Sequence, residues 1–304
     1  MTLTQLRYIV AVDRHGSFAR AAKQCLVTQP TLSLQVQKLE QEIGQEIFDR
    51  TRSPIVPTHY GRRIIEQARS VLREADRILE MFREDEEAPS GEISIGMIPT
   101  VSPYLMPHLY RGLTERYGRI DFKTFELPTT EIIERIRSGE MDLGILATPL
   151  NQKDIVETAL YYEPFVAYFP EDYSGKRQNL SFQELDGYEM ILLSQEHCFR
   201  NQALQVCGRR SGGRIECGSL ETLKRMVDRG AGITLLPSLS VTDAEKNRIG
   251  KFKAPQPARE ISLIHGRNFF KKKVFNAIRD LILESIPAAL RRKAGRRVLG
   301  IEVD

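Results

Sequence analysis

Residues 18–40 read FARAAKQCLVTQPTLSLQVQKLE, and this stretch decides the fold of the N-terminal region. An Ala-rich segment comes first, and its small side chains allow another backbone to approach closely. Thr28 is a preferred N-cap residue, and Pro30 stands in a first helical turn, where its missing N–H is not needed. A second helix then continues to about residue 43 and ends at Gly44. Two short helices joined by a tight turn are what a helix-turn-helix requires.

The first turns of this second helix carry side chains of a size that base edges accept. Glutamine can form two hydrogen bonds with adenine in the major groove, and threonine can contact a thymine methyl group. We therefore predict DNA contacts from Gln29, Pro30, Thr31, Ser33 and Gln35. Residues 48–58 read as a two-stranded ribbon, from which Arg50 and Arg52 would reach phosphates or the minor groove. A plain helical bundle is the alternative interpretation of this spacing.

A long helix is predicted over residues 59–87. Its apolar side chains recur at alternating steps of four and three residues, which is typical of a helix that pairs with another helix. This seam consists of Ile64, Ala68, Val71, Ala75, Ile78 and Phe82. The helix could pack on its own domain or join two chains. We favour the second interpretation, because nothing nearby in the sequence would cover the seam.

The rest of the chain alternates between predicted strands and helices. Repeated strand–helix units over residues 92–290 predict an α/β domain with a parallel sheet, in two sub-lobes with a cleft between them. The expected organisation is a DNA-binding domain at 1–58, a linker helix and hinge at 59–91, a regulatory domain at 92–290 and a basic tail at 291–304. The tail shows no periodicity and is expected to be disordered.

The composition fits a DNA-binding protein of the cytoplasm. The 304 residues carry a net charge of +4, and residues 1–63 hold nine lysines and arginines against five acids, which suits an anionic partner. No apolar run approaches the ~20 residues that span a bilayer, and the N-terminus has no secretory pattern. Four cysteines are too few for a disulfide scaffold, so a reducing compartment is expected.

Two cysteines stand out as redox candidates. Cys198 directly follows His197 and lies close to Arg200, and positive neighbours lower a thiol pKa and favour the reactive thiolate. Cys207 lies nine residues further on, where it could resolve a sulfenic acid. Two unrelated core cysteines are the alternative. Cys25 and Cys217 are expected to be packed thiols, and the cysteine spacing matches no usual zinc pattern.

The N-terminal 60 residues resemble the DNA-binding domain of LysR-type transcriptional regulators. The matching motifs are Phe-Ala-Arg-Ala-Ala at 18–22, Thr-Gln-Pro-Thr-Leu-Ser at 28–33, the segments 36–40 and 44–50, and Thr58 with Gly61. The resemblance implies a winged helix-turn-helix, a long linker helix for dimerisation, and a two-lobed effector domain similar to periplasmic binding proteins. It also implies that the helix from residue 29 to residue 43 is the recognition helix.

The segment around Cys198 is similar to the redox segment of the peroxide-sensing members of this family. That similarity implies that Cys198 is the peroxidatic thiol and Cys207 the resolving one. It also implies roles near the peroxide for Thr100, for Thr129 or Thr130, for His197, and for Arg267 as the basic residue facing the thiol. Asn201 departs from the pattern, which usually has aspartate at this position.

The sequence therefore predicts a regulator that binds promoter DNA and is switched by hydrogen peroxide through a Cys198–Cys207 disulfide. We expect a dimer or tetramer, RNA polymerase as a further partner, and no cofactor, metal or membrane. One alternative is a family member that responds to a small metabolite in the inter-lobe cleft. The other is a thiol peroxidase, an enzyme, which we disfavour because no peroxidase scaffold is recognisable.

Overall fold

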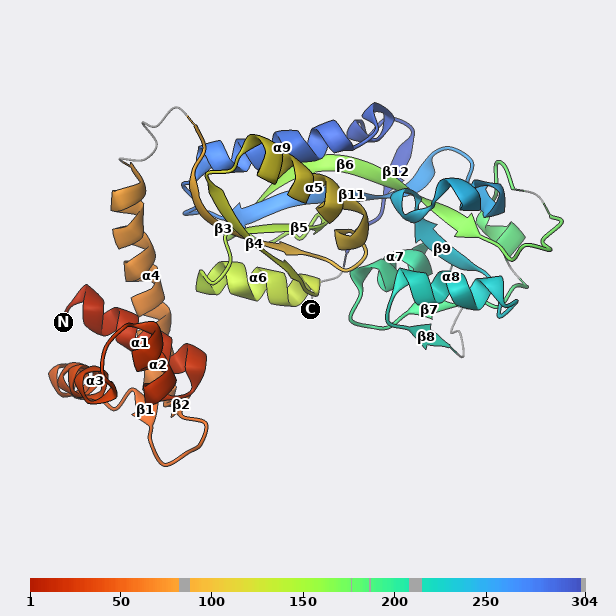
Figure 1. The fold of residues 1–304 in the computed structure, drawn as a ribbon. Helices are drawn as coiled ribbons and strands as arrows, with labels where there is room; N and C mark the ends of the chain where they lie inside the picture. Colours follow the sequence, from red (N-terminus) through yellow and green to blue (C-terminus); the bar gives the residue numbers. More distant parts are fainter. Residues whose placement is uncertain (82–87, 176, 186, 208–214, 302–304) are drawn as a thin grey trace. The chain divides into compact units, whose positions relative to one another are not determined.

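The computed structural model describes residues 1–81, 88–175, 177–185, 187–207 and 215–301, which form parts of two compact units. The first unit spans Met1–Glu86 and the second Glu87–Asp304 (Figure 1). None of the helices within the described ranges has the length and apolar character that crossing a bilayer requires.

The first unit is a winged helix-turn-helix followed by a long helix, as predicted. Its elements are α1 (Leu3–His15), α2 (Phe18–Gln24), α3 (Gln29–Ile43), β1 (Phe48–Asp49), β2 (Val56–Pro57) and α4 (His59–Met81). The side chain of Ser17 caps α2 and that of Thr28 caps α3. Gly44 ends α3 in the left-handed conformation that favours glycine. Local capping signals therefore fixed these boundaries.

The start of α4 is tied to the strand pair, which forms the wing. Thr58 Oγ1 donates to the Glu46 carbonyl at 2.7 Å and accepts from the Gly61 N–H at 2.9 Å. A Cβ atom at Gly61 would lie 1.9 Å from the Ile47 carbonyl oxygen, so only glycine allows this approach. Ile65 and Ala68 are buried in the core of this unit. Part of the predicted seam is thus covered within its own chain.

The second unit is built on a mixed sheet, so the prediction of a parallel sheet holds for its first three strands and is wrong for its two long strands. Its helices are α5 (Ser102–Arg116), α6 (Thr129–Ser138), α7 (Cys198–Cys207), α8 (Leu220–Asp228) and α9 (Lys272–Ser285). Its strands are β3 (Gly91–Met97), β4 (Ile120–Glu126), β5 (Leu143–Thr148), β6 (Ile155–Tyr168), β7 (Leu192–Leu193), β8 (Glu216–Cys217), β9 (Thr234–Pro237), β10 (Ile249–Lys251), β11 (Gln256–Gly266) and β12 (Arg296–Val298). The described residues also contain the short 3-10 helices η1 (Phe182–Leu185), η2 (Ser238–Ser240), η3 (Asp243–Arg248) and η4 (Ala288–Arg291).

Two long antiparallel strands are the reason for the mixed sheet. Strands β3, β4 and β5 pair in parallel, but β11 pairs antiparallel with both β5 and β6. The sheet order is β10-β6-β11-β5-β3-β4, with β9 on β6 and β12 on β11. Polar residues such as Glu157 and Thr158 interrupt the apolar pattern in the first half of β6, so only its second half has the apolar run typical of a buried strand.

The second unit has two hydrophobic cores, which define two lobes. We call lobe 1 the part around β3, β4 and β5 with α5, α6 and α9, and lobe 2 the part around β7 to β10 with α7 and α8 (Figure 1). Strand β6 runs through both lobes, since its first half lines one core and its second half the other. The predicted two-lobed domain is thus confirmed.

The expectation of a disordered tail is wrong for residues 291–301. Strand β12 pairs in parallel with the start of β11, and Leu299 and Ile301 are buried. The side-chain amides of Gln202 and Gln205 on α7 donate to the carbonyls of Leu299 and Gly300. The tail therefore packs on α7, the helix that begins at Cys198 and ends at Cys207. Residues 302–304 lie outside the described part.

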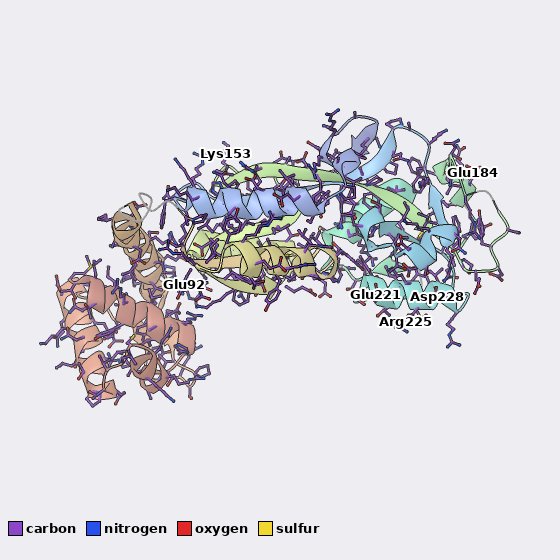
Figure 2. The ribbon with its side chains drawn as sticks, turned by 45° about the horizontal axis from the view of Figure 1, so that its top comes forward. Glu92, Lys153, Glu184, Glu221, Arg225 and Asp228 are labelled. Carbon is purple, nitrogen blue, oxygen red and sulfur yellow. The ribbon has the colours of Figure 1, made fainter. Side chains whose placement is uncertain are left out.

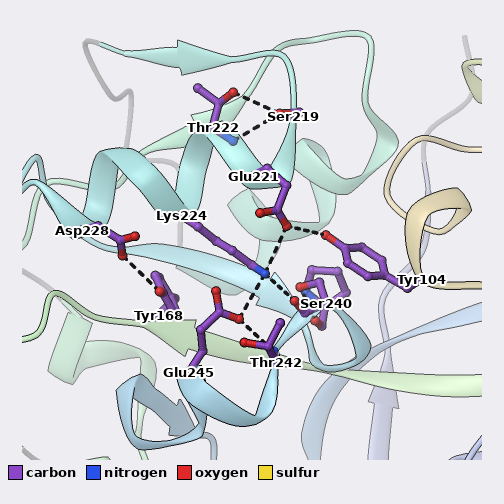
Figure 3. A network of polar contacts seen from close by, with 11 residues as sticks. Tyr104, Tyr168, Ser219, Glu221, Thr222, Lys224, Asp228, Ser240, Thr242 and Glu245 are labelled. Carbon is purple, nitrogen blue, oxygen red and sulfur yellow. Dashed lines mark hydrogen bonds and ion pairs between the residues drawn. The ribbon is translucent and has the colours of Figure 1, made fainter.

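A polar network joins the lobes (Figure 3). The Tyr104 hydroxyl on α5 donates to Glu221 on α8 at 3.2 Å. The buried Lys224 ammonium lies 3.2 Å from both Glu221 and Glu245 and donates to the Ser240 carbonyl. Tyr104 belongs to lobe 1 and the other groups belong to lobe 2. The hydrogen bond from Tyr104 to Glu221 therefore connects the two lobes.

Candidate redox site and DNA-binding face

Cys198 is the first residue of α7 and lies where the two lobes meet. Its side chain packs against the core of lobe 1, while the next residue, Phe199, is buried in the core of lobe 2. The Phe199 ring stacks on Phe165 of β6, with 5.0 Å between the ring centroids. A change in the bonding of Cys198 would therefore act on the packing of both lobes.

Two groups from other elements face the Cys198 thiol. The buried Thr129 hydroxyl at the start of α6 has no nitrogen or oxygen partner among the described residues, so the thiol is the group that it can bond. The Arg259 guanidinium on β11 is close enough for its charge to act on the thiol. Both groups, with the backbone amides at the start of α7, stabilise a thiolate.

Burial is nevertheless the largest influence on this thiol and raises the pKa of Cys198, and the other groups only partly counter it. The sequence suggested instead that His197 and Arg200 would lower this pKa. The His197 ring lies 3.1 Å from the Gly218 carbonyl oxygen and 3.6 Å from Glu196. The Arg200 guanidinium pairs with Glu216 at 2.6 Å. Both His197 and Arg200 thus have other partners.

Arg259 is the basic residue of this site, and sequence reasoning missed it. Its side chain is 1% exposed and makes four hydrogen bonds. Its Nε and Nη2 donate to Glu163 Oε2 at 2.9 and 2.8 Å, and its Nη1 donates to Thr100 Oγ1 at 2.7 Å. Its charge also lies over the Phe199 ring, 5.4 Å from the centroid. A charged residue within an apolar strand was the signal that could have revealed it.

The structure does not bring Arg267 to the thiol. Its Nε donates to the carbonyl of Lys153 at 2.5 Å. Figure 2 labels Lys153 in lobe 1 and, for orientation, Glu221 in lobe 2, so Arg267 is bound to lobe 1. Arg267 follows Arg259 by eight residues, about 26 Å at the rise of an extended chain. Of the two threonines left open by the sequence, Thr129 is buried at the site and Thr130 is exposed. Thr100 is buried and bonded to Arg259.

The segment between the two cysteines is helical, which fits residues 199–206, since they contain neither Gly nor Pro. Helix α7 runs from Cys198 to Cys207, and nine steps of about 1.5 Å place their Cα atoms about 13 Å apart. A disulfide needs Cα atoms within about 7 Å, so this conformation cannot form one. The side chain of Cys207 lies outside the described part of the structure. Asn201 is half-buried on the same helix.

The DNA-binding candidates on α3 differ in how freely they face solvent. Gln29, Pro30 and Thr31 are exposed at the helix start. The Thr31 hydroxyl is hydrogen bonded to that of Thr28 at 2.8 Å. Ser33 and Gln35 are half-buried, and the Gln35 side-chain oxygen accepts from Gln5 on α1 at 3.3 Å. Gln29 is thus the freest of the predicted base-reading side chains.

The arginines of the wing line one cavity of about 620 Å³. Arg20, Arg50 and Arg52 contribute to its wall, which makes the cavity strongly cationic. Arg50 is held by Glu40 at 2.7 Å and lies 5.1 Å from the Phe18 ring centroid, so it also supports the wing. Arg52 is more exposed and pairs only weakly with Asp49 at 3.2 Å.

Comparisons with known proteins agree with this organisation. Residues 3–62 match the family described as bacterial regulatory helix-turn-helix protein, lysR family, and residues 86–287 match the LysR substrate binding domain. The chain belongs to the LysR family of bacterial transcriptional regulators.

Within that family the similar proteins are peroxide regulators. The hydrogen peroxide-inducible genes activator of Dickeya chrysanthemi is 37% identical over 273 residues, which cover 87% of this chain and 89% of that protein. The DNA-binding transcriptional dual regulator OxyR of Escherichia coli K12 has the same identity and coverage. The structure of a full-length OxyR variant from Pseudomonas aeruginosa, in which aspartate replaces one cysteine, superposes with a TM-score of 0.81 at 33% identity, covering 93% of this chain and 94% of that one.

Proposed function

We propose that this protein is an OxyR-like regulator that senses hydrogen peroxide through Cys198 and binds promoter DNA through α3 and the wing. The observation that carries the proposal is the meeting of Cys198, Thr129 and Arg259 at the lobe junction. The peroxide-responsive relatives support it. The site of action would be the cytoplasm, where promoter DNA is found.

The chemistry follows from these groups. The Cys198 thiolate attacks one peroxide oxygen, the O–O bond breaks, and the leaving hydroxide takes a proton to become water. The resulting sulfenic acid then condenses with the Cys207 thiol, which forms the disulfide and releases a second water. Arg259 and Thr129 would stabilise the thiolate and orient the peroxide. A dithiol or glutathione-type reductant would return the two electrons and reset the protein.

Thiol mapping by mass spectrometry tests the proposal. One equivalent of peroxide should produce a Cys198–Cys207 disulfide and leave Cys25 and Cys217 reduced. A protein whose operator binding changes with a metabolite, but whose thiols and DNA contacts ignore peroxide, would be the metabolite-responsive alternative. Continuous peroxide turnover with reductant would instead indicate the peroxidase.

We expect base readout to depend on Gln29. Gln29→Ala should cost about 1–3 kcal/mol of operator affinity and relax the preference at one base pair, because a bidentate contact is lost. Binding to a randomised operator library measures both effects. The control is Gln41→Ala, which alters an exposed residue in the last turn of the same helix. Unchanged affinity and preference in the Gln29 variant would remove this residue from base readout.

Phosphate contact is best tested at Arg52, because Arg50 also holds the wing. Arg52→Ala should weaken binding about equally on all sequences and reduce the slope of log K against log salt by about one. Fluorescence anisotropy over a series of salt concentrations gives the slope. A loss confined to the specific operator, with an unchanged slope, would contradict the phosphate assignment.

The wider partners belong to the same proposal. Two recognition helices reading paired half-sites require at least a dimer, and α4 is our candidate for the contact between chains. A tetramer and a contact with RNA polymerase are expected from the proposed role as an activator.

A further inference from the structure

Glu163 is the one carboxylate that is fully buried among the described residues, and both of its oxygens accept hydrogen bonds. It lies on β6 at the lobe junction. Its Oε2 accepts from Nε and Nη2 of Arg259, and its Oε1 accepts from the Leu239 N–H at 2.7 Å. Both Glu163 and Arg259 are 1% exposed, so water screens this pair little.

The geometry of this pair determines which atoms of Arg259 remain for other partners. Glu163 occupies the Nε–Nη2 edge, so Nη1 faces the Thr100 hydroxyl, while Nη2 also donates to the Thr100 carbonyl at 3.0 Å. The Phe199 ring covers the guanidinium. Thr100 and Phe199 would keep Arg259 in place even without the carboxylate. Glu163 therefore differs from them in supplying charge.

The charge matters because Cys198 faces few other ionised groups. From α6 it meets the neutral Thr129 hydroxyl, from its own helix the backbone amides, and from β11 the Arg259 cation. Of the neighbouring side chains, His197 and Glu196 turn to Gly218 and to each other. Tyr161 on β6 is buried beside Glu163 and Arg259, and burial raises its pKa, so it stays neutral. The electrostatic field at the thiol is thus set by the positive charge of Arg259 and by the carboxylate that offsets this charge.

We propose that Glu163 acts through Arg259, whose charge it offsets, and thereby limits the reactivity of Cys198 before peroxide arrives. This inference rests on the proposed redox role of Cys198. A full cation beside the thiol would hold more of it as thiolate and make it react with any electrophile. With its charge only partly offset, Arg259 still favours the thiolate to some extent, while the thiol stays largely protonated.

The test is the pH dependence of Cys198 alkylation by iodoacetamide, followed in the reduced full-length protein by mass spectrometry of the Cys198 peptide. The rate constant follows the thiolate fraction, so its midpoint reports the thiol pKa. Glu163→Gln should move the midpoint down by about one unit and speed alkylation about tenfold at neutral pH, because the Arg259 charge is no longer offset. Glu163→Asp keeps the charge and should restore the midpoint.

Asp142→Asn is the matched control. Asp142 pairs with Lys271 at 3.0 Å and directly precedes β5. Thr148, six residues later at the other end of β5, pairs with Glu260, the residue next to Arg259, so Asp142 lies roughly 20 Å along the strand from this site. Its loss should leave the alkylation profile unchanged. If the Glu163→Gln profile coincides with the wild-type profile, or moves to higher pH, Glu163 does not limit the thiol and the proposal is wrong.

A second variant covers the case in which Glu163→Gln does not fold. The double variant Glu163→Gln/Arg259→Met removes both charges and leaves no unpaired ion. Its midpoint should lie above that of the wild type, because the cation that favours the thiolate is gone. An unchanged midpoint would mean that the pair is only structural. Alkylation needs no peroxide, so a protein that shows these shifts but ignores peroxide would contradict the proposed function and not this inference.

Discussion

Cys198→Ser is expected to abolish the response to peroxide completely, while Cys207→Ser should still be oxidised at Cys198 but should not rearrange. The difference follows from the helix between the two residues. In α7 their Cα atoms lie about 13 Å apart, nearly twice the reach of a disulfide. Peroxide first oxidises only the sulfur of Cys198. Formation of the disulfide with Cys207 then requires the helix to unwind.

The unwinding would cost much of the packing of α7. Phe199, Ala203 and Val206 are each about 2% exposed or less in the core of lobe 2. Exposing a buried aromatic or branched side chain costs about 1.5–3 kcal/mol each. The amide contacts from Gln202 and Gln205 to the tail would also break. The oxidised and reduced proteins must therefore differ in more than one bond, as a two-state switch requires.

Hydrogen exchange and operator footprinting measure the two steps separately. In the wild type, peroxide should increase exchange in residues 198–207 and 296–301 and change the footprint. Cys207→Ser should show a sulfenic acid at Cys198 with neither change. Cys217→Ser is the control, since Cys217 is a buried thiol of β8 and should leave both readouts intact. A full footprint change in Cys207→Ser would show that the disulfide is not the switch.

The pH dependence of the first step has a definite sign. Burial raises the pKa of the Cys198 thiol, so at neutral pH only a minor fraction is thiolate. Below that pKa, the rate of oxidation should rise about tenfold for each unit of pH, since the thiolate is the reacting species. Stopped-flow oxidation across pH values checks this. A rate independent of pH from about 6 to 8 would indicate a thiol that is already ionised.

The parts of the fold that sequence predicted well are those with local signals. Helices α2 and α3 begin at capping side chains that lie within three residues of their partners, so their bounds are written in the sequence. Helix α6 likewise ends at Gly139 in the left-handed conformation. Each of these signals can be recognised without knowing what lies across the core.

The parts that sequence missed depend on contacts between distant segments. Glu163 and Arg259 are 96 residues apart, and only the antiparallel pairing of β6 with β11 brings them together. The C-terminal tail has no periodic pattern in the sequence. It is nevertheless ordered, because Leu299 is buried in the core of lobe 2 and β12 pairs with β11. The family resemblance predicts that Arg267 faces the thiol. Arg259 near the start of β11 lies at the thiol, whereas Arg267 follows the far end of this strand.

The seam of α4 leads to the second large effect, at Ile78. The first half of the seam is partly covered in its own unit, where Ala68 is buried. Ile78 is 60% exposed on the following turns, an apolar side chain that this chain leaves uncovered. Phe82 lies outside the described residues. The dimerising surface that we expect is therefore the C-terminal half of α4, centred on Ile78, and not the whole seam.

Ile78→Asp should separate the DNA-binding domains of two chains. A carboxylate in an apolar contact between chains has no partner, and leaving a buried charge unpaired costs about 3–5 kcal/mol. Affinity for an operator with two half-sites should fall by more than a hundredfold, whereas the weak affinity for a single half-site should stay unchanged. Anisotropy titrations on both DNAs measure the two values, and sedimentation velocity gives the oligomeric state of the full chain.

Ser70→Asp provides the control on the same helix. The Ser70 side chain accepts from Arg73 at 2.9 Å, on the polar face of α4, so a carboxylate there gains a cation and should leave paired half-site binding intact. If Ile78→Asp bound the paired operator as tightly as the wild type, the C-terminal half of α4 would not join the chains. Because Ile78 is exposed in the single chain, the substitution should not unfold the monomer, so a loss of binding would report on association and not on stability.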